Sequence, residues 1–203
     1  MKRSGSLEVI CGCMYSGKTE ELIRRVRREQ IAKRRIQVFK SHLDTRYSLE
    51  AIITHDGKEI EAKQVPLSSS RRLEEMIDRQ AEVVAIDEIQ FFDMGIVSLC
   101  DDLANSGVRV IVAGLDLDFR GEPFPGPIQA LMAKADKIDK LTAVCVECGE
   151  SATRSQRLLN GEPAKWDEAV LVVGAREFYV AVCRNHYRID RPTTLPSSRL
   201  QTT

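Results

Sequence analysis

Apolar runs alternate with amphipathic stretches along the chain up to residue 144. Continuous apolar runs predict buried strands of a parallel sheet at 7–11, 36–39, 83–86, 109–114 and 138–144. Periodic apolar positions predict helices at 19–35, 71–81, 96–104 and 128–135. Because strands and helices alternate, the pattern indicates an α/β fold, with a mainly parallel sheet flanked by helices. Two further strand-like segments, 51–55 and 58–65, flank the hairpin signal Asp56-Gly57.

The first predicted helix has two faces of different character. Its apolar positions are expected to face the core, and they are Leu22, Ile23, Val26 and Ile31. Its basic positions are expected to form a solvated surface, and they are Arg24, Arg25, Arg27 and Arg28. A nucleic-acid patch on this basic face is the less favoured alternative.

The pattern changes at residue 144. Short strand-like pieces at 152–159, 169–173 and 178–182 are joined by turns such as Asn160-Gly161. They predict a small β-rich lobe over 144–190, which follows an α/β domain over 1–143. The remaining segment, 191–203, is dominated by Pro, Ser and Thr and is expected to be a disordered tail.

Composition and charge narrow the function classes. The chain has 203 residues, of which 43% are hydrophobic and 30% charged, and its basic and acidic residues balance to a net charge of zero. That balance argues against a broad electrostatic grip on nucleic acid or an anionic membrane. We find no apolar signal segment and no stretch near the ~18 apolar residues of a membrane span. With six cysteines and no export signal, a reducing cytoplasm and a bound metal are favoured over disulfides.

A phosphate-binding pattern, G-x-x-x-x-G-K-[ST], lies between the first predicted strand and helix. Its residues are Gly12-Cys13-Met14-Tyr15-Ser16-Gly17-Lys18-Thr19. The glycines let successive backbone N–H groups turn toward phosphate oxygens, and the helix N-terminus adds partial positive charge. Lys18 would reach the β- and γ-phosphates, and the Thr19 hydroxyl would bind Mg²⁺. The loop therefore predicts binding of a magnesium–nucleoside triphosphate complex.

Two acids, Asp87 and Glu88, end the third apolar run. They lie at the carboxyl end of a buried strand, where open α/β sheets bind their ligands. Asp87 suits a Mg²⁺ partner downstream of a phosphate loop. Glu88 is expected to face another direction and to serve as a general base, for water in an ATPase or for a hydroxyl in a kinase.

A second motif lies in the β-rich lobe. Cys145-x-x-Cys148 and Cys183-x-x-His186 can each chelate a metal from one tight turn. Together they complete a tetrahedral Cys₃His set with no position left for water. We therefore predict a structural zinc site.

These motifs leave two function classes open. One is a kinase that acts on a small hydroxyl substrate, and the other is an NTPase whose zinc ribbon binds nucleic acid or protein. The zero net charge and the absence of a basic–aromatic run in the ribbon favour the kinase. The length favours it too, because little chain remains for motor or helicase elements.

The motifs resemble the zinc-bearing, cytosolic type of thymidine kinase over residues 5 to 188. Beside the loop and the zinc knuckles, the resemblance rests on Asp44-Thr45-Arg46-Tyr47, Thr54-His55-Asp56, Asp87-Glu88-x-Gln90-Phe91-Phe92 and Gly114-Leu115-Asp116-x-x-Phe119-x-x-x-Pro123-Phe124. It implies ATP-dependent phosphorylation of the thymidine 5′-hydroxyl, feedback inhibition by dTTP, and a homotetramer or dimer. Neither nucleic acid nor membrane is an expected partner.

The resemblance also assigns roles to individual residues. Glu88 matches the catalytic base and Asp87 the metal-associated acid. The ATP-binding segments match Gly12 to Thr19, Asp44, Thr45, Arg46, Asp87, Glu88, Ile89 and Gln90. The nucleoside pocket matches Met14, Leu115, Phe119, Phe124, Ser155, Val170, Leu171, Val172, Val173, Gly174 and Tyr179, and the lobe is expected to close over the nucleoside. Ser155 replaces the usual threonine, and Cys13 stands where many relatives have proline.

Overall fold

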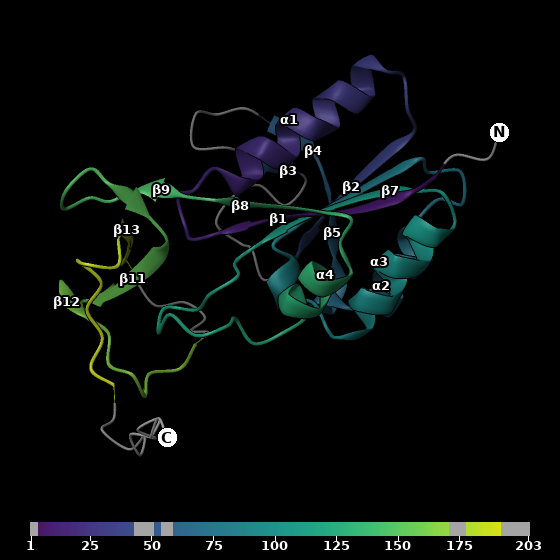
Figure 1. Ribbon diagram of the computed structural model, residues 1–203. Helices are drawn as coiled ribbons and strands as arrows, with labels where there is room; N and C mark the ends of the chain where they lie inside the picture. Colours follow the sequence, from purple (N-terminus) through teal and green to yellow (C-terminus); the bar gives the residue numbers. More distant parts are fainter. Residues whose placement is uncertain (1–3, 43–50, 54–58, 171–177, 192–203) are drawn as a thin grey trace, which may run out of the picture.

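A six-stranded parallel sheet forms the centre of the molecule (Figure 1). The computed structural model describes residues 4–42, 51–53, 59–170 and 178–191. The sheet order is β5-β2-β6-β7-β1-β8. Its strands are β1 (Ser6–Gly12), β2 (Ile36–Ser41), β5 (Lys63–Val65), β6 (Val83–Asp87), β7 (Arg109–Gly114) and β8 (Lys137–Leu141). The predicted α/β class with a mainly parallel sheet is confirmed.

Helices cover both faces of the sheet. Helix α1 (Lys18–Ile31) lies on one face, and α2 (Ser70–Met76), α3 (Gly95–Asn105) and α4 (Ile128–Lys134) lie on the other (Figure 1). Neighbouring residues of β1 therefore enter different cores: Val9 packs on the α3 side and Ile10 on the α1 side, both without solvent exposure. Burial on both faces explains why the central strands are continuous apolar runs. Among the described helices, none is long and apolar enough to cross a membrane.

Helix α1 ends four residues before the predicted end at Arg35. Ala32 caps the helix, and Lys33 takes a left-handed backbone conformation with φ of 56°. Ile31, which we expected in the core, is 83% exposed in the last turn. The predicted helix at 71–81 is also shorter, since α2 ends at Met76 and Ile77 is extended. Both differences lie at helix ends, where apolar periodicity carries the least information.

Arg25 corrects the expectation of a fully solvated basic face on α1. Its side chain is only 4% exposed and pairs with three carboxylates. The distances are 2.7 Å to Glu8, 2.8 Å to Glu21 and 2.5 Å to Asp139. Glu8 lies on the same face of β1 as Ile10 and also accepts from Arg109 at 2.7 Å. The sheet therefore contributes a buried acid beneath α1, and Arg25 compensates its charge.

We expect Arg25→Ala to lower the free energy of unfolding by about 3–5 kcal/mol, because it leaves Glu8 buried with a partner missing. The neighbouring Arg24 is a matched control, since its side chain is 58% exposed and its ion pair among the described residues is with Glu21. In urea unfolding, Arg24→Ala should lower the free energy of unfolding by only a small fraction of that loss, because exposed ion pairs contribute little. Equal losses in the two variants would contradict a special role for the buried cluster.

Acid should weaken the same cluster. Burial raises the pKa of Glu8, but Arg109 and Arg25 outweigh burial and hold that pKa below its ordinary value. Hydrogen bonding from Arg24, and then from Arg25, lowers the pKa of Glu21 from 4.5 to about 2. Because the folded pKa values are depressed, the stabilisation is complete above the unfolded pKa and is lost as pH falls through the folded pKa.

We therefore expect the melting temperature to fall steeply between about pH 4.5 and about pH 2. Glu8→Gln should melt lower at neutral pH, and its melting temperature should depend less on pH across the acid range. A Glu8→Gln acid profile parallel to the wild-type profile would show that Glu8 contributes nothing to the transition.

The two strands of the predicted hairpin pair with each other, but the second strand is divided, and the predicted turn Asp56-Gly57 lies outside the described residues. β3 (Ala51–Ile53) pairs antiparallel with β4 (Glu59–Glu61). After Ala62 the chain continues as β5, which joins the main sheet parallel to β2. The apolar pattern at 58–65 did not reveal this division, because both halves are extended and alternate in polarity.

The β-rich lobe lies beyond the end of β8, away from the N-terminus of the chain (Figure 1). Its strands are β9 (Ala143–Val144), β10 (Ser151–Ala152), β11 (Arg154–Leu159), β12 (Glu162–Pro163) and β13 (Phe178–Val182). Asn160-Gly161 joins β11 to β12, and both residues have positive φ as a type I′ turn requires. Ala169 and Val170 are not in a strand, and the rest of the piece predicted at 169–173 lies outside the described residues. The predicted tail, except for Arg191, also lies outside them.

Candidate active site

The phosphate loop follows β1 at the carboxyl edge of the sheet. Gly12 has φ of 142°, and a Cβ there would lie 2.4 Å from the carbonyl oxygen of Leu141 on β8. Gly17 has φ of 82° and caps α1 in a left-handed conformation. Side chains at these positions would clash or strain the backbone, so the two glycines make the turn from β1 into α1 possible.

The polar side chains of the loop fold back onto its own backbone. The Lys18 Nζ and the Ser16 Oγ each donate to the Cys13 carbonyl oxygen at 2.8 Å. This arrangement holds the Lys18 ammonium over the loop, within reach of a phosphate bound there. Tyr15, by contrast, is 51% exposed.

Thr19 and Asp87 form the candidate magnesium site. The Thr19 hydroxyl donates to Asp87 Oδ2 at 3.1 Å, which joins the start of α1 to the end of β6. Burial, and next the charge of Glu88, raises the pKa of Asp87 to about 7. A divalent cation would compensate the charge of this buried carboxylate, and oxygen donors of this kind are the ligands that magnesium prefers. The two residues therefore fit the ion.

The backbone leaves strand β6 at Glu88, the residue immediately after Asp87. Its φ of 52° and ψ of 43° place it in the left-handed region, and its N–H donates to Asp87 Oδ1 at 2.9 Å. The buried Gln90 donates through Nε2 to the Glu88 carboxylate, and its Oε1 accepts the Leu115 N–H at 3.0 Å. Gln90 thus ties the Glu88 carboxylate to the end of β7. A Cβ on Gly114 would lie 2.5 Å from Gln90 Oε1, so this link needs glycine there.

The loop after β7 is organised by a residue that the motifs did not indicate. Asp118 is buried, and its Oδ1 accepts the N–H groups of Arg120 at 2.9 Å and Glu122 at 3.1 Å. The turn presents Phe119 to the lobe, where the Tyr187 hydroxyl donates to the Phe119 carbonyl oxygen at 2.6 Å. The loop and the lobe are therefore joined directly.

Arg157 is the largest buried polar side chain that sequence patterns missed. It is 1% exposed, lies 5.1 Å from the centre of the Phe119 ring and donates to the Ala169 carbonyl oxygen at 2.6 Å. It lies two residues after Ser155 on β11, so both side chains occupy one face of the small sheet. Tyr179 is directly opposite Arg157 on β13 and shares that face. Period-two spacing from Ser155 was the available signal for Arg157.

The structure brings together several of the residues predicted to bind the nucleoside. Leu115 and Val170 pack against the main core that contains Phe124. Ser155 accepts the backbone N–H of Met14 at 2.9 Å, so its hydroxyl is engaged with the phosphate loop. The Ile89 side chain is wholly buried in the main core, which leaves only its backbone for a ligand. The predicted residues Asp44, Thr45, Arg46, Leu171, Val172, Val173 and Gly174 lie outside the described residues.

The four predicted zinc ligands converge in the lobe. The ligand atoms of Cys145, Cys148, Cys183 and His186 all lie within 4.8 Å of one another. The Cys148 and Cys183 sulfurs are 3.8 Å apart, and His186 Nδ1 lies 3.3 Å from Cys183 Sγ and 3.7 Å from Cys145 Sγ. Zinc–sulfur bonds of about 2.3 Å in a tetrahedron require sulfurs about 3.8 Å apart. The set therefore fits zinc, with His186 binding through Nδ1.

The backbone supports thiolates at this centre. Burial raises the pKa of the Cys145 thiol, but N–H groups of Cys183, Glu147 and Cys148 outweigh burial and lower the pKa to about 6. All six cysteines are free of disulfides. The first knuckle is also joined to β13, the strand that leads into the second knuckle, because the Val146 N–H donates to the Ala181 carbonyl oxygen at 3.1 Å.

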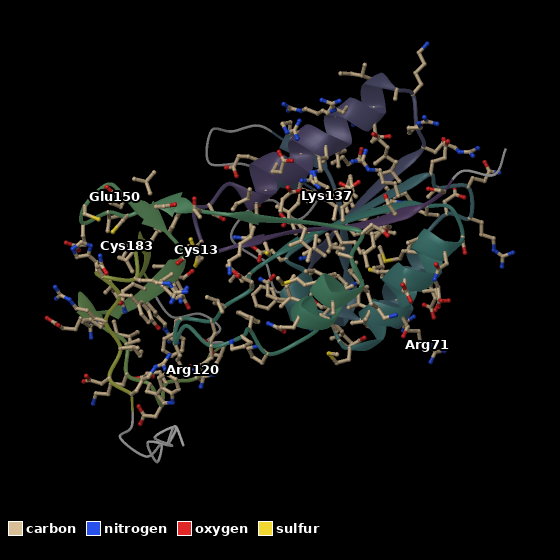
Figure 2. The ribbon with its side chains drawn as sticks, viewed as in Figure 1. Cys13, Arg71, Arg120, Lys137, Glu150 and Cys183 are labelled. Atoms are coloured by element: carbon tan, nitrogen blue, oxygen red, sulfur yellow. The ribbon has the colours of Figure 1, made fainter. Side chains whose placement is uncertain are left out.

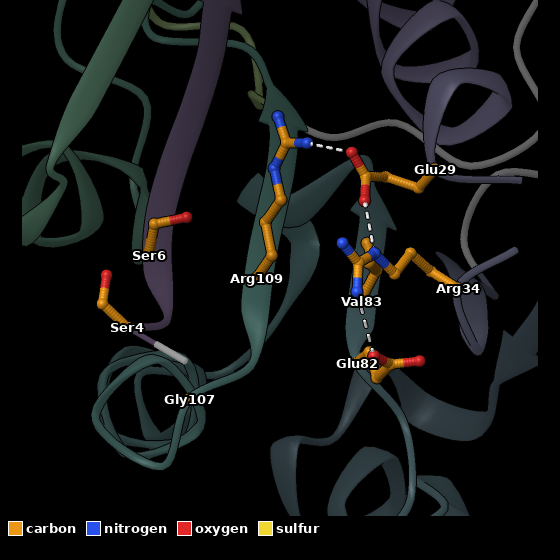
Figure 3. Close-up of a pocket in the computed structure, with 8 residues that line it drawn as sticks. All are labelled: Ser4, Ser6, Glu29, Arg34, Glu82, Val83, Gly107 and Arg109. Carbon is orange, nitrogen blue, oxygen red and sulfur yellow. Dashed lines mark hydrogen bonds and ion pairs between the residues drawn. The ribbon is translucent and has the colours of Figure 1, made fainter. Parts of the chain in front are cut away.

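A separate cavity of about 250 Å³ lies at the other end of the sheet (Figure 3). Its lining includes Ser6, Val83 and Arg109, which are the first residues of β1, β6 and β7. Two ion pairs also line the cavity, Arg109 with Glu29 at 2.5 Å and Arg34 with Glu82 at 3.4 Å. The cavity is therefore distant from the phosphate loop and is no part of the candidate active site.

A comparison with protein families agrees with the site. Residues 5–187 match the family described as thymidine kinase. The match covers the phosphate loop, the acids that end β6 and all four predicted zinc ligands.

Proposed function

The chain belongs to the thymidine kinase family, and from this we propose that it transfers the γ-phosphoryl group of ATP to the 5′-hydroxyl of thymidine, giving dTMP and ADP. The observation that carries the proposal is the junction of two strand ends. The phosphate loop after β1 and the acids after β6 meet through the Thr19–Asp87 hydrogen bond. A γ-phosphate bound to the loop and the general base Glu88 would thereby lie at one edge of the sheet.

Phosphoryl transfer asks the protein mainly for position and charge compensation. Residues 12–19 would bind the triphosphate through backbone N–H groups, and Lys18 would exchange its Cys13 partner for phosphate oxygens. Thr19 and Asp87 would hold magnesium, which when bound neutralises phosphate charge. Arg46 would add to this charge compensation.

Glu88 would act on the nucleoside side. Its carboxylate is held by Gln90, so it is oriented before substrate arrives. It would accept a hydrogen bond from the 5′-hydroxyl and take the proton as the new P–O bond forms. The thymine ring would be surrounded by Met14, Leu115, Phe119, Phe124, Tyr179 and residues 170–174. The zinc lobe would close over it.

We also propose a cytoplasmic homotetramer or dimer that dTTP inhibits. A zinc-binding thiolate cluster and unpaired cysteines suit a reducing compartment. The assembly and the feedback rest on the family alone. Sizing the protein would test the assembly, and turnover measured with and without dTTP would test the feedback.

The test is ADP release with a panel of thymidine, deoxyuridine and deoxycytidine, beside a blank without nucleoside. Mass spectrometry should find dTMP formed in step with ADP. A further arm adds single-stranded DNA in place of nucleoside. Turnover stimulated by DNA and absent with thymidine would overturn the proposal in favour of a nucleic-acid-dependent NTPase.

A further inference from the structure

We propose that the zinc lobe holds the phosphate loop in its binding shape, and that Ser155 is the positioning residue. The coupling rests on the proposed function in taking residues 12–19 as the ATP site. It differs from the role that the family resemblance gives the lobe, which is to serve the nucleoside.

The first observation is a hydrogen bond between parts of the chain 141 residues apart. The Met14 N–H donates to Ser155 Oγ at 2.9 Å, and the Ser155 side chain is buried. Met14 lies in the middle of the phosphate loop, whose shape depends on where each backbone N–H points. A bond from one of these groups to a buried hydroxyl fixes the backbone at that residue.

The second observation concerns the preceding residue, Cys13. Its side chain packs in the core of the lobe together with the zinc ligands Cys145 and Cys183. Its Sγ also donates to the Ala152 carbonyl oxygen of β10 at 3.4 Å. Cys13 and Cys183 lie at the same end of the molecule (Figure 2). One residue of the phosphate loop is therefore part of the zinc lobe's core.

The chain path explains why the coupling is direct. The lobe begins two residues after Leu141, the β8 residue that Gly12 approaches too closely to carry a side chain. The loop is thus held by Leu141 at its start, by the lobe core at Cys13 and by Ser155 at Met14. Since zinc orders the small lobe, zinc should also order the loop.

The decisive variant is Ser155→Ala, which removes the acceptor of the Met14 N–H. We expect the Kd for magnesium–ATP, titrated without nucleoside, to rise on the order of tenfold. Ser155→Thr keeps a hydroxyl at the same position and should restore binding to within about twofold. If Ser155 had a purely structural role, the Kd for ATP would not depend on whether residue 155 carries a hydroxyl.

Gln156→Ala is the matched control. Gln156 is also buried on β11, but its side chain lies on the opposite face and accepts the Arg188 N–H at 2.8 Å within the lobe. Its loss should destabilise the lobe without changing the ATP Kd. If Gln156→Ala weakens ATP binding as much as Ser155→Ala, the effect is general loosening of the lobe, and the positioning role is wrong.

Zinc content and melting temperature must be measured on every variant. If Ser155→Ala loses zinc or unfolds, Ser155→Cys provides the test, because its sulfur preserves packing but accepts hydrogen bonds weakly. It should weaken ATP binding while one zinc per chain remains. Unchanged ATP affinity in a folded, zinc-loaded Ser155→Cys protein would overturn the proposal.

The outcome is separable from that of the proposed function. If Ser155→Ala raises only the KM for thymidine, the coupling fails and the kinase assignment stands. If no nucleoside is phosphorylated, but the ATP Kd rises in Ser155→Ala and is restored in Ser155→Thr, the coupling stands and the substrate assignment fails.

Discussion

Glu88→Gln should lower kcat for thymidine phosphorylation by about 10²–10⁴-fold and leave the Kd for ATP nearly unchanged. The amide keeps the volume of Glu88, and its oxygen can still accept from Gln90 Nε2. It cannot take a proton from the 5′-hydroxyl. The loss should therefore appear in the chemical step, measured by single-turnover kinetics at saturating ATP and thymidine.

The geometry around Glu88 makes this substitution a clean test. The left-handed backbone of residue 88 and the hydrogen bond from Gln90 both fix the position of the carboxylate. We therefore expect the glutamine side chain of the variant to occupy the same position. Glu74→Gln on the exposed surface of α2 makes the same chemical change away from the site and should retain full activity. Wild-type turnover in Glu88→Gln would exclude Glu88 as the base.

The central strands and the zinc ligands were predictable from sequence for local reasons. Residues of β6 are buried on both faces, and this explains why the strand is apolar up to its last residue, Asp87. The zinc ligands come from short C-x-x-C and C-x-x-H turns, whose geometry hardly depends on the rest of the fold. The phosphate loop was predictable likewise, because the turn from β1 into α1 needs positive φ at Gly12 and Gly17, which is a local requirement.

Arg25 shows where helix patterns fail. Amphipathicity separates apolar from polar positions, but it cannot tell a solvated arginine from one that faces an acid in the sheet. The signal lay elsewhere, in Glu8, a charged residue inside the first apolar run. A buried acid in a central strand requires a cation above it, and α1 provides one.

The contact of Ser155 with Met14 could not be predicted from either segment alone. It depends on the register of β11 with β13 and on how the lobe packs against the loop. Buried polar groups such as Arg157 and Asp118 share this dependence, because their partners lie on other elements. Sequence thus indicated the chemistry of each half of the site and missed the connection between them.

Removal of zinc should have the largest effect on the whole site. We expect Cys145→Ser to abolish zinc binding, to disorder the lobe and to lower kcat/KM for thymidine by more than about 100-fold, because structural zinc contributes about 10–16 kcal/mol in small zinc domains. Metal analysis and turnover measure the first and last of these effects. Cys100→Ala, which changes a buried thiol in the α/β core, should keep one zinc per chain and most of its activity.

The single tryptophan reports the state of the lobe. Trp166 lies with the Arg120 and Arg191 guanidinium carbons 5.6 Å and 5.2 Å from its ring, at the junction of the lobe with the loop after β7. Its emission should shift toward that of solvent-exposed tryptophan in Cys145→Ser. ATP affinity should fall as well, since the lobe core includes Cys13 and Ser155 holds Met14. A zinc-free protein with native Trp166 emission, full ATP affinity and full turnover would show that the metal orders neither the lobe nor the phosphate loop.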